Sequence, residues 1–198
     1  MIRAFDLLTS LVGLLLLLPL LLLVALVIKL EDRGPVFFRQ VRVGRHGQSF
    51  RIWKFRTMVV DAENLGRAIT VGRDARVTRS GHWLRHWKLD ELPQLINVFV
   101  GEMGFVGPRP EVPRYVALYS EEQRRVLELR PGVTDLASIA YRHESELLKE
   151  HEDPEAYYVQ EIMPDKIRIN LEYARRASLW RNIKVILATI GLLKPQWV

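Results

Sequence analysis

The feature that most constrains this chain is an uncharged, leucine-dominated run from Leu7 to Ile28. As a helix this run would be about 33 Å long at about 1.5 Å per residue, enough to cross a hydrocarbon core of about 30 Å. A cleaved signal peptide is a poor explanation, because the run is too long and no small-residue cleavage site follows it. The charged segment Lys29–Pro35 ends the run instead. The sequence therefore predicts a retained membrane anchor over residues 1–32 and a second region over residues 33–198.

Pro19 lies near the middle of this anchor, where it removes a helical hydrogen bond and favours a kink. Two arrangements remain open. A spanning helix would place the basic segment Arg33–Arg45 in the cytoplasm and the N-terminus outside. A bent, re-entrant helix would return both ends to one face, with Arg3 and Asp6 at the lipid headgroups. The residues alone lean towards the spanning helix, since kinked spanning helices are common.

Positive charge is concentrated in one part of the chain. The formal net charge is +6, and residues 39–88 hold 12 Lys and Arg against 3 Asp and Glu. Such a block indicates an anionic partner, which is a phosphate-bearing substrate, lipid headgroups or nucleic acid. The chain has no cysteine, which excludes a disulfide framework and a thiolate zinc site.

The remaining pattern predicts a mixed α/β, helix-rich fold. Two β-rich runs, residues 36–43 and 49–56, are separated by a short Gly-containing loop typical of a hairpin. Helices are expected over residues 61–69, 81–87, 120–129, 166–176 and 179–193. The last of these is apolar with basic residues at its start, which is typical of a helix at a membrane interface. Residues 101–110 are expected to be a rigid loop, and residues 133–142 an extended segment.

Two adjacent carboxylates, Asp90 and Glu91, lie between a basic, aromatic approach and a short apolar helix pattern. Asp90 is placed to cap that helix, with Pro93 in its first turn. A helix start with cations behind it favours anions, so phosphates can collect here. Adjacent helical residues diverge by about 100°, so one carboxylate can attack while the other holds a metal or a proton. Taken alone, the pair is also explained as an ordinary N-cap with a dipole-favourable Glu beside it.

A second candidate is Arg109, which lies between Pro108 and Pro110. The prolines restrict the backbone, and a guanidinium held in one direction suits two-pronged phosphate recognition. An ordinary turn with a solvated arginine is the competing interpretation. His82 and His86 are at a spacing that can hold a metal, but we interpret them as non-ligating because no HExxH motif is present.

Several motifs occur in order along the chain, at Arg3–Asp6, Gly34–Gln40, Lys54–Met58, Leu84–Arg85, Leu89–Gln94, Asn97–Val98, Gly101–Met103, Val106–Pro110 and Arg130–Thr134. In number, order and spacing they resemble the small monotopic phosphoglycosyl transferases, also called bacterial sugar transferases. The resemblance covers almost the whole chain. It is specific for that reason, whereas an Asp-Glu pair alone would not be.

The resemblance implies a reaction. A sugar-1-phosphate is expected to pass from a UDP-sugar to a polyprenyl phosphate such as undecaprenyl phosphate, as the first membrane step of surface glycan or glycoconjugate synthesis. The Asp of the family's dyad is the nucleophile, which corresponds to Asp90, and it would carry the phosphosugar after UMP leaves. Mg²⁺ is the implied cofactor, held by Asp90 and Glu91. The implied phosphate-binding residues are Lys54, Arg56, Arg85, Pro108, Arg109, Pro110 and Arg142.

The resemblance also implies a monotopic architecture at the cytoplasmic face of the bacterial inner membrane. A re-entrant helix kinked at Pro19, a small β-hairpin region and interfacial amphipathic helices would surround the Asp-Glu active site. Residues 33–198 would form the cytoplasmic catalytic domain. Membrane lipids are expected partners, nucleic acid is not, and homo-oligomerisation is left open. The sequence departs from the family pattern at Leu18, where Ser usually precedes the proline, and at Lys88 and Asp135.

Two alternatives to an enzyme are open to the residues. A membrane-tethered nucleic-acid binder would use the arginine block and the interleaved Trp53, Trp83 and Trp87. A non-catalytic membrane scaffold would need only the apolar ends of the chain. Neither gives the Asp-Glu pair or the Pro-Arg-Pro loop a task.

Overall fold

The structure, a computed structural model, describes residues 1–62 and 74–194. Its elements are α1 (Ile2–Asp32), β1 (Phe37–Val43), η1 (Arg45–Gly47), β2 (Ser49–Phe55), α2 (Arg79–His86), η3 (Leu89–Glu91), α3 (Gln94–Val100), β3 (Gly104–Val106), α4 (Pro113–Val116), η4 (Gln123–Glu128), β4 (Gly132–Thr134), α5 (Leu136–Ala140), α6 (Glu144–Lys149), α7 (Pro154–Tyr157), η5 (Tyr158–Ile162), α8 (Met163–Ala174) and α9 (Leu179–Thr189). The chain is helix-rich with little β-structure, which confirms the predicted mixed class. The helix predicted over residues 61–69 lies almost entirely outside the described residues.

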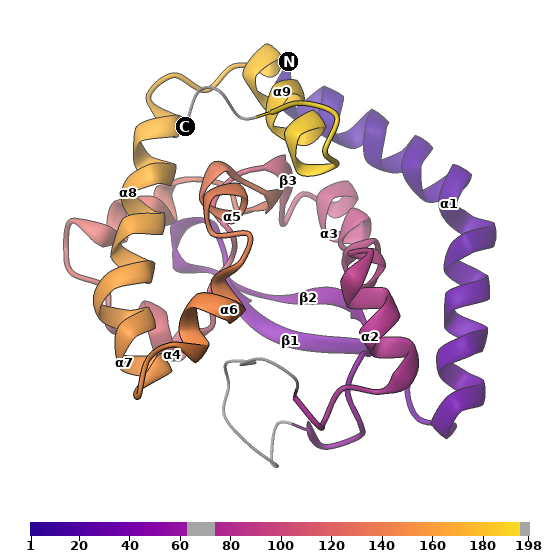
Figure 1. The fold of residues 1–198 in the computed structure, drawn as a ribbon. Helices are drawn as coiled ribbons and strands as arrows, with labels where there is room; N and C mark the ends of the chain where they lie inside the picture. The colour runs from indigo at the N-terminus through magenta and orange to yellow at the C-terminus, as the bar shows by residue number, and fades with distance from the viewer. Residues whose placement is uncertain (63–73, 195–198) are drawn as a thin grey trace.

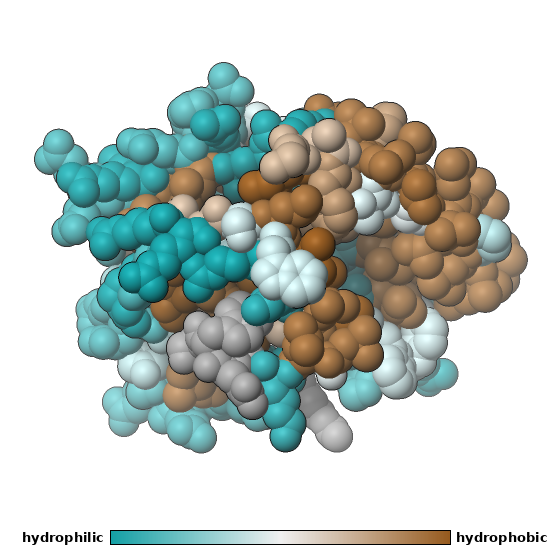
Figure 2. All heavy atoms as spheres, turned by 90° about the horizontal axis from the view of Figure 1, so that it is seen from above, coloured by the Kyte–Doolittle hydropathy of each residue, from teal (hydrophilic) through white to brown (hydrophobic). Residues whose placement is uncertain are grey.

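The N-terminal run forms one long helix, α1, which by length and composition could cross a membrane. Pro19 lies inside it, and the ribbon changes direction partway along (Figure 1). Most of its leucines are exposed, and Figure 2 shows apolar side chains covering this helix. Because water-exposed apolar surface of this extent is unfavourable, α1 requires lipid or another apolar partner.

Both ends of α1 are tied to the rest of the molecule. Near the N-terminus, Arg3 donates to the carbonyls of Val98 at 2.6 Å and Phe99 at 2.7 Å, at the C-terminal end of α3. The last carbonyls of a helix lack intrahelical partners and attract cations. At the other end, Asp32 pairs with Arg56, just beyond β2. The helix therefore lies alongside α2 and α3 (Figure 1).

We expect the Asp32–Arg56 pair to make stability acid-sensitive. Hydrogen bonding from the Arg56 guanidinium lowers the pKa of Asp32 from 3.8 to about 2. A carboxyl group whose pKa is lower in the folded protein stabilises the fold at pH values above its pKa in the unfolded chain. This stabilisation is lost as the pH falls towards its pKa in the folded protein. Because solvent screens this partly exposed pair, Asp32→Asn should lower the free energy of unfolding by only about 1 kcal/mol at neutral pH, with the difference shrinking between pH about 4 and about 2. Urea titrations at several pH values measure it. The exposed Glu121→Gln is the control, and a pH-independent difference would contradict the prediction.

The hairpin is formed as predicted, with β1 and β2 paired antiparallel along their whole length. Its inner face packs against α3 through a small apolar cluster of Ile52, Val98 and Met103. A second cluster joins α1 to the hairpin and α2 through Ile28, Phe55 and Leu84. Helix α1, the hairpin and the helix pair α2–α3 therefore share apolar contacts.

Asn97 of α3 fastens that helix to β2, and its loss should be costly. Its amide oxygen accepts from the backbone N–H of Trp53 at 2.9 Å, and its amide nitrogen donates to the carbonyl of Arg51 at 3.0 Å. Asn97→Ala would remove the side-chain partner of the Trp53 N–H and one of two donors to the Arg51 carbonyl, which also accepts from Arg39 at 3.3 Å. We expect a loss of about 3 kcal/mol in the free energy of unfolding, measured by chemical denaturation. The exposed Val100→Ala on the same helix is the control, and equal losses from both changes would contradict this reasoning.

Two segments, residues 101–110 and 133–142, differ from the sequence prediction. Residues 104–106 of the predicted loop form β3, which pairs in parallel with β4. Residues 133–142 are extended only as far as Thr134 and then form α5, so the prediction of a wholly extended segment is wrong. The reason is local: Asp135 caps the helix by accepting from the backbone N–H of Ser138 at 2.8 Å.

The C-terminal half packs around a separate apolar cluster, in which α8 and η5 contact α6, α4 and η4 through residues such as Leu148, Ile162 and Met163. The final helix, α9, is amphipathic as predicted. Val185 and Ala188 on one face are buried, whereas Trp180 is exposed. Just beyond the helix, the exposed Ile190 and Leu192 continue the apolar surface. This pattern suits a helix at a membrane interface.

Candidate active site

Asp90 and Glu91 lie in the short helix η3, directly before α3. The prediction that Asp90 caps α3 is wrong, because Pro93 occupies the cap position and no side chain caps either helix. The chain instead turns sharply at Lys88, which adopts a left-handed conformation with φ of 56°. This turn brings the end of α2 against η3, so that basic residues of α2 approach the two carboxylates.

The Asp90 carboxylate is buried and has an oxygen with no partner. Asp90 is only 8% exposed, and its Oδ1 accepts no hydrogen bond within residues 1–62 and 74–194. Burial raises the pKa of Asp90, and the negative charge of Glu91 adds to the rise, although Lys54 and Arg85 oppose it. Buried polar atoms are ordinarily paired. An unpaired carboxylate oxygen at this depth is therefore free to bind or attack a ligand.

Glu91, by contrast, is fully engaged. Lys54 donates to Oε1 at 2.9 Å, and Arg109 donates to both carboxylate oxygens, to Oε2 at 3.3 Å. Burial opposes ionisation of Glu91, but the charges of Arg109 and Lys54 outweigh it and hold its pKa well below the ordinary value. Glu91 is therefore ionised at neutral pH. It fixes two cations beside Asp90, from β2 and from the loop after β3.

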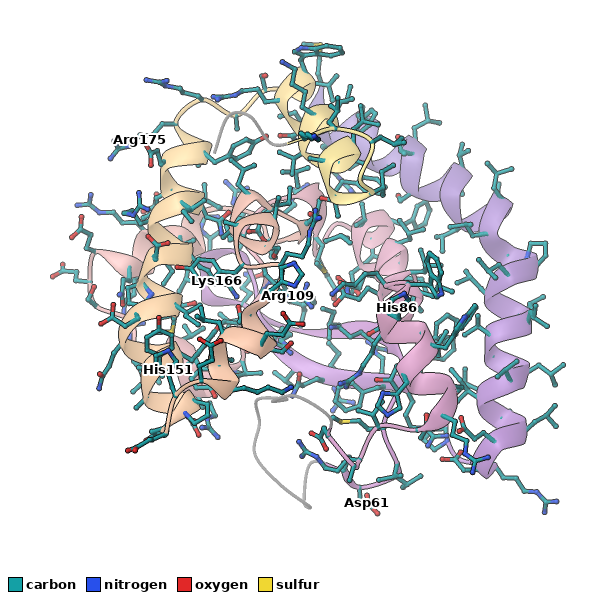
Figure 3. The ribbon with its side chains drawn as sticks, in the orientation of Figure 1. Asp61, His86, Arg109, His151, Lys166 and Arg175 are labelled. Atoms are coloured by element: carbon teal, nitrogen blue, oxygen red, sulfur yellow. The ribbon has the colours of Figure 1, made fainter. Side chains whose placement is uncertain are left out.

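The two carboxylates face a cleft of about 710 Å³. Lys54, Arg85, Lys88 and Arg109 line it together with Asp90 and Glu91, and the wall towards the C-terminal end of α1 includes the apolar Phe37, Val59 and Val60. Figure 3 places Arg109 near the middle of the molecule. A cleft with this excess of positive charge suits a polyanion such as a diphosphate.

Most of the predicted phosphate-binding residues meet here. Lys54 and Arg109 share Glu91, while Arg85 is oriented by donating from Nε to the hydroxyl of Thr57 at 2.9 Å. Burial lowers the pKa of Arg85, and the nearby negative charge of Asp90 opposes this. Pro108 and Pro110 flank Arg109 as the sequence indicates, and Pro110 is buried.

Two of the predicted residues lie differently. Arg56 reaches the cleft wall, but its guanidinium is committed to Asp32 and to the carbonyl of Pro35 at 2.5 Å. The Arg56 side chain is only 7% exposed, so this buried pairing at the end of α1 argues against a task for Arg56 in binding phosphate. Arg142 is exposed and is not among the residues that line the cleft. Phosphate binding by either arginine stays a prediction.

Sequence reasoning missed Arg42 of β1, which also lines the cleft. In the hairpin register Phe38 lies opposite Lys54. Side chains on a strand alternate between its faces, so Phe38, Gln40 and Arg42 share the face of Lys54. This alternation along the predicted hairpin could have identified Arg42 as a neighbour of Lys54 from the sequence.

A magnesium ion fits this site only together with a substrate. Within the described part of the chain, no three His, Cys, Asp or Glu side chains gather as a metal cage. Mg²⁺ in phosphate-processing proteins is commonly held by one or two carboxylates, with water and substrate phosphates completing its shell. The unpaired Oδ1 of Asp90, with Glu91 beside it, is compatible with that shared arrangement.

The fold and the cleft define a class: proteins with a strongly basic cleft beside an apolar helix suited to a bilayer. Comparison with known proteins specifies it further. The chain belongs to the bacterial sugar transferase family, whose model matches residues 1–194. This confirms the family that the sequence motifs indicate.

Among the relatives, the undecaprenyl-phosphate glucose phosphotransferase of Komagataeibacter xylinus is 43% identical over 195 residues, 95% of this chain and 35% of the relative. The UDP-glucose:undecaprenyl-phosphate glucose-1-phosphate transferase of Escherichia coli (strain K12) is 37% identical over 196 residues, 95% of this chain and 39% of the relative. The UDP-N-acetylgalactosamine-undecaprenyl-phosphate N-acetylgalactosaminephosphotransferase of Aeromonas hydrophila is 34% identical over 197 residues, 95% and 42% of the two chains. The chain thus spans less than half the length of these relatives.

Proposed function

We propose that the chain transfers a sugar-1-phosphate from a UDP-sugar to undecaprenyl phosphate or another polyprenyl phosphate, with release of UMP, in polysaccharide biosynthesis. The observation that carries the proposal is the buried Asp90 carboxylate, free at Oδ1, beside a Glu91 that fixes two cations. The names of the relatives describe sugar transfer to undecaprenyl phosphate, with glucose in two and N-acetylgalactosamine in one. The sugar of this chain's donor is therefore a matter for a donor screen.

In the proposed first step, an oxygen of Asp90 attacks the phosphorus that bears the sugar. The bond from that phosphorus to the bridging oxygen of the diphosphate breaks, and UMP leaves with the electron pair. In the second step, an oxygen of the polyprenyl phosphate attacks the same phosphorus. The bond to Asp90 breaks, which regenerates the carboxylate and yields a polyprenyl diphosphate sugar. Two displacements let a soluble donor and a lipid acceptor use one site in turn.

Electrostatics decide whether this attack is feasible, because a carboxylate and a diphosphate repel each other. Arg85 and Arg109 are placed to stabilise the phosphate oxygens with charge-assisted hydrogen bonds. Mg²⁺, if held by the unpaired Oδ1 of Asp90 and the diphosphate, would cancel further negative charge. Glu91 would join that shell only by releasing a contact to Lys54 or Arg109. Glu91 has a second effect: by occupying Lys54 and Arg109, it keeps these cations from neutralising Asp90 before the donor binds.

The proposal is tested by UMP release. Protein in detergent or nanodiscs, given Mg²⁺, undecaprenyl phosphate and a panel of UDP-sugars, should release UMP in step with lipid-linked sugar, and chelation should stop it. No release with any donor would refute the transferase. The nucleic-acid alternative has no supporting observation in the described structure, and it would gain support only from salt-dependent DNA binding by a protein that releases no UMP.

We further propose that α1 is re-entrant and that the molecule is monotopic on the cytoplasmic face of the bacterial inner membrane, with the anchor over residues 1–32 and the catalytic domain over residues 33–198. The support is that both ends of α1 contact that domain, through Arg3 and Asp32, and that Pro19 lies within the helix. A helix that crossed the bilayer would carry its two ends to opposite faces.

Cysteine labelling tests this topology, since the chain has no cysteine of its own. In spheroplasts we expect Ile2→Cys to resist a membrane-impermeant maleimide and to react after lysis. The exposed Arg175→Cys, on the catalytic domain, should behave identically. If Ile2→Cys reacts in intact spheroplasts while Arg175→Cys stays protected, α1 crosses the membrane.

A further inference from the structure

The loop that carries Arg109 is bound by Arg42 of β1, a residue that has no role in the proposed reaction so far. Arg42 of β1 donates from one terminal nitrogen to the carbonyl of Pro110 at 3.1 Å and to the Glu111 carboxylate at 3.4 Å. Its other terminal nitrogen donates to Gln40 at 2.6 Å. Arg42 thereby connects the hairpin that carries Lys54 to the residue that directly follows Arg109.

This contact is largely buried and joins opposite charges. The side chains of Arg42 and Glu111 are 18% and 16% exposed. Glu111 also accepts from the hydroxyl of Tyr158 at 2.6 Å, which ties the loop to the C-terminal half. The backbone N–H of Val43 donates to the Glu111 carbonyl at 2.9 Å. Both the backbone of β1 and the Arg42 side chain therefore bind the loop at residues 110–111. A buried guanidinium with a buried counter-ion is a rigid support rather than a mobile surface arginine.

We infer that Arg42 is a positioning residue for the phosphate-binding Arg109, acting through the Pro110 carbonyl. The inference rests on the proposed function. Arg109 itself is 41% exposed on its side chain, so its direction depends on its backbone and on Glu91. With Pro110 fixed by Arg42, the guanidinium is already aligned with Glu91 before the diphosphate arrives. Without Arg42, the loop is joined to β1 only by the backbone bond from Val43 to Glu111, and Glu111 loses its counter-ion.

The chemistry depends on small displacements at this point. A shift of about 1 Å in a group that orients a substrate can cost about 100-fold in rate. Phosphate-binding arginines are sensitive in this way because their paired N–H groups must match the acceptor oxygens. Removing Arg42 should therefore lower activity only in a protein that still has Arg109, because the loss comes from the misalignment of that side chain.

A double-mutant cycle measures that dependence. Arg42→Ala should lower kcat/KM for the UDP-sugar about 30-fold, but less than about threefold in an Arg109→Lys background, because both changes then remove the same aligned contact. Arg45→Ala is the matched control: this neighbouring arginine is exposed, outside the cleft, and donates to the Glu128 carbonyl at 2.9 Å. Equal losses from Arg42→Ala in both backgrounds would overturn the inference. If the alanine variant fails to fold, Arg42→Lys replaces it, with the same two outcomes.

Hydrogen exchange provides a readout that is independent of turnover. Backbone amides of residues 104–112 should exchange faster in Arg42→Ala than in the wild type, and at wild-type rates in Arg45→Ala. Unchanged exchange in Arg42→Ala would overturn the inference. If the wild type releases no UMP from any donor, the proposed function fails by itself, and the exchange experiment still decides whether Arg42 holds the Arg109 loop.

Discussion

Replacing Asp90 with Asn is expected to abolish sugar-1-phosphate transfer, with a loss in kcat of at least about 10⁴-fold. The amide has the size of the carboxylate but lacks its negative charge, so it is a poor nucleophile towards phosphorus. The protein should still fold, because Oδ1 of Asp90 makes no hydrogen bond within the described residues that Asn would forfeit. Stability should even rise slightly, since burial disfavours the ionised carboxylate and raises its pKa. Single-turnover UMP release and thermal melting measure the two effects.

Asp165→Asn is a suitable control for this change. Asp165 pairs with Arg168 on α8, outside the set of residues that line the cleft, and its loss should leave kcat unaltered. The covalent step can be observed directly with donor labelled in the transferred phosphate. A labelled peptide that contains Asp90 is expected after rapid quenching and digestion. Wild-type turnover by Asp90→Asn would remove this residue as the nucleophile.

The second large effect is expected at Glu91. Glu91→Gln should lower kcat/KM about 10³-fold and the free energy of unfolding by about 3 kcal/mol. The physical reason is that the negative charge of Glu91 lies between Lys54 and Arg109 and offsets their repulsion. Removing that charge leaves two close cations that repel each other, one of them on a strand and largely buried. The freed cations would also approach Asp90 and neutralise it. Steady-state kinetics and urea denaturation measure the two losses.

Two further variants show whether this explanation is right. Glu172→Gln removes an exposed carboxylate that pairs with Arg168 at 3.4 Å on α8, and it should change stability by no more than about 0.5 kcal/mol. Adding Lys54→Gln to Glu91→Gln removes one uncompensated charge, so stability should partly recover while activity does not. If Glu91→Gln keeps both wild-type stability and activity, Glu91 does not organise the site.

Local sequence was enough for the elements that depend on neighbouring residues. The uncharged run from Leu7 to Ile28 specifies a long apolar helix, because no charge interrupts it and nearly all of its side chains are apolar. The alternating runs around residues 44–48 specify the hairpin for the same local reason. Short caps were harder to predict: the helix start expected at Asp90 lies at Pro93 instead, because a separate turn after Lys88 takes up the two carboxylates.

What the sequence determined by itself was the set of chemical groups: a membrane-length helix, an Asp-Glu pair, a fixed Pro-Arg-Pro loop and an excess of arginines. Only the tertiary structure decided how the charges around the cleft pair, because these pairs join distant segments. Lys54 and Arg109 lie 37 and 18 residues from the Glu91 that they share. Arg56 is paired with the end of α1, whereas Arg42 supports the Arg109 loop. A guanidinium binds whichever oxygen the packed backbone brings within reach, and composition cannot specify that choice.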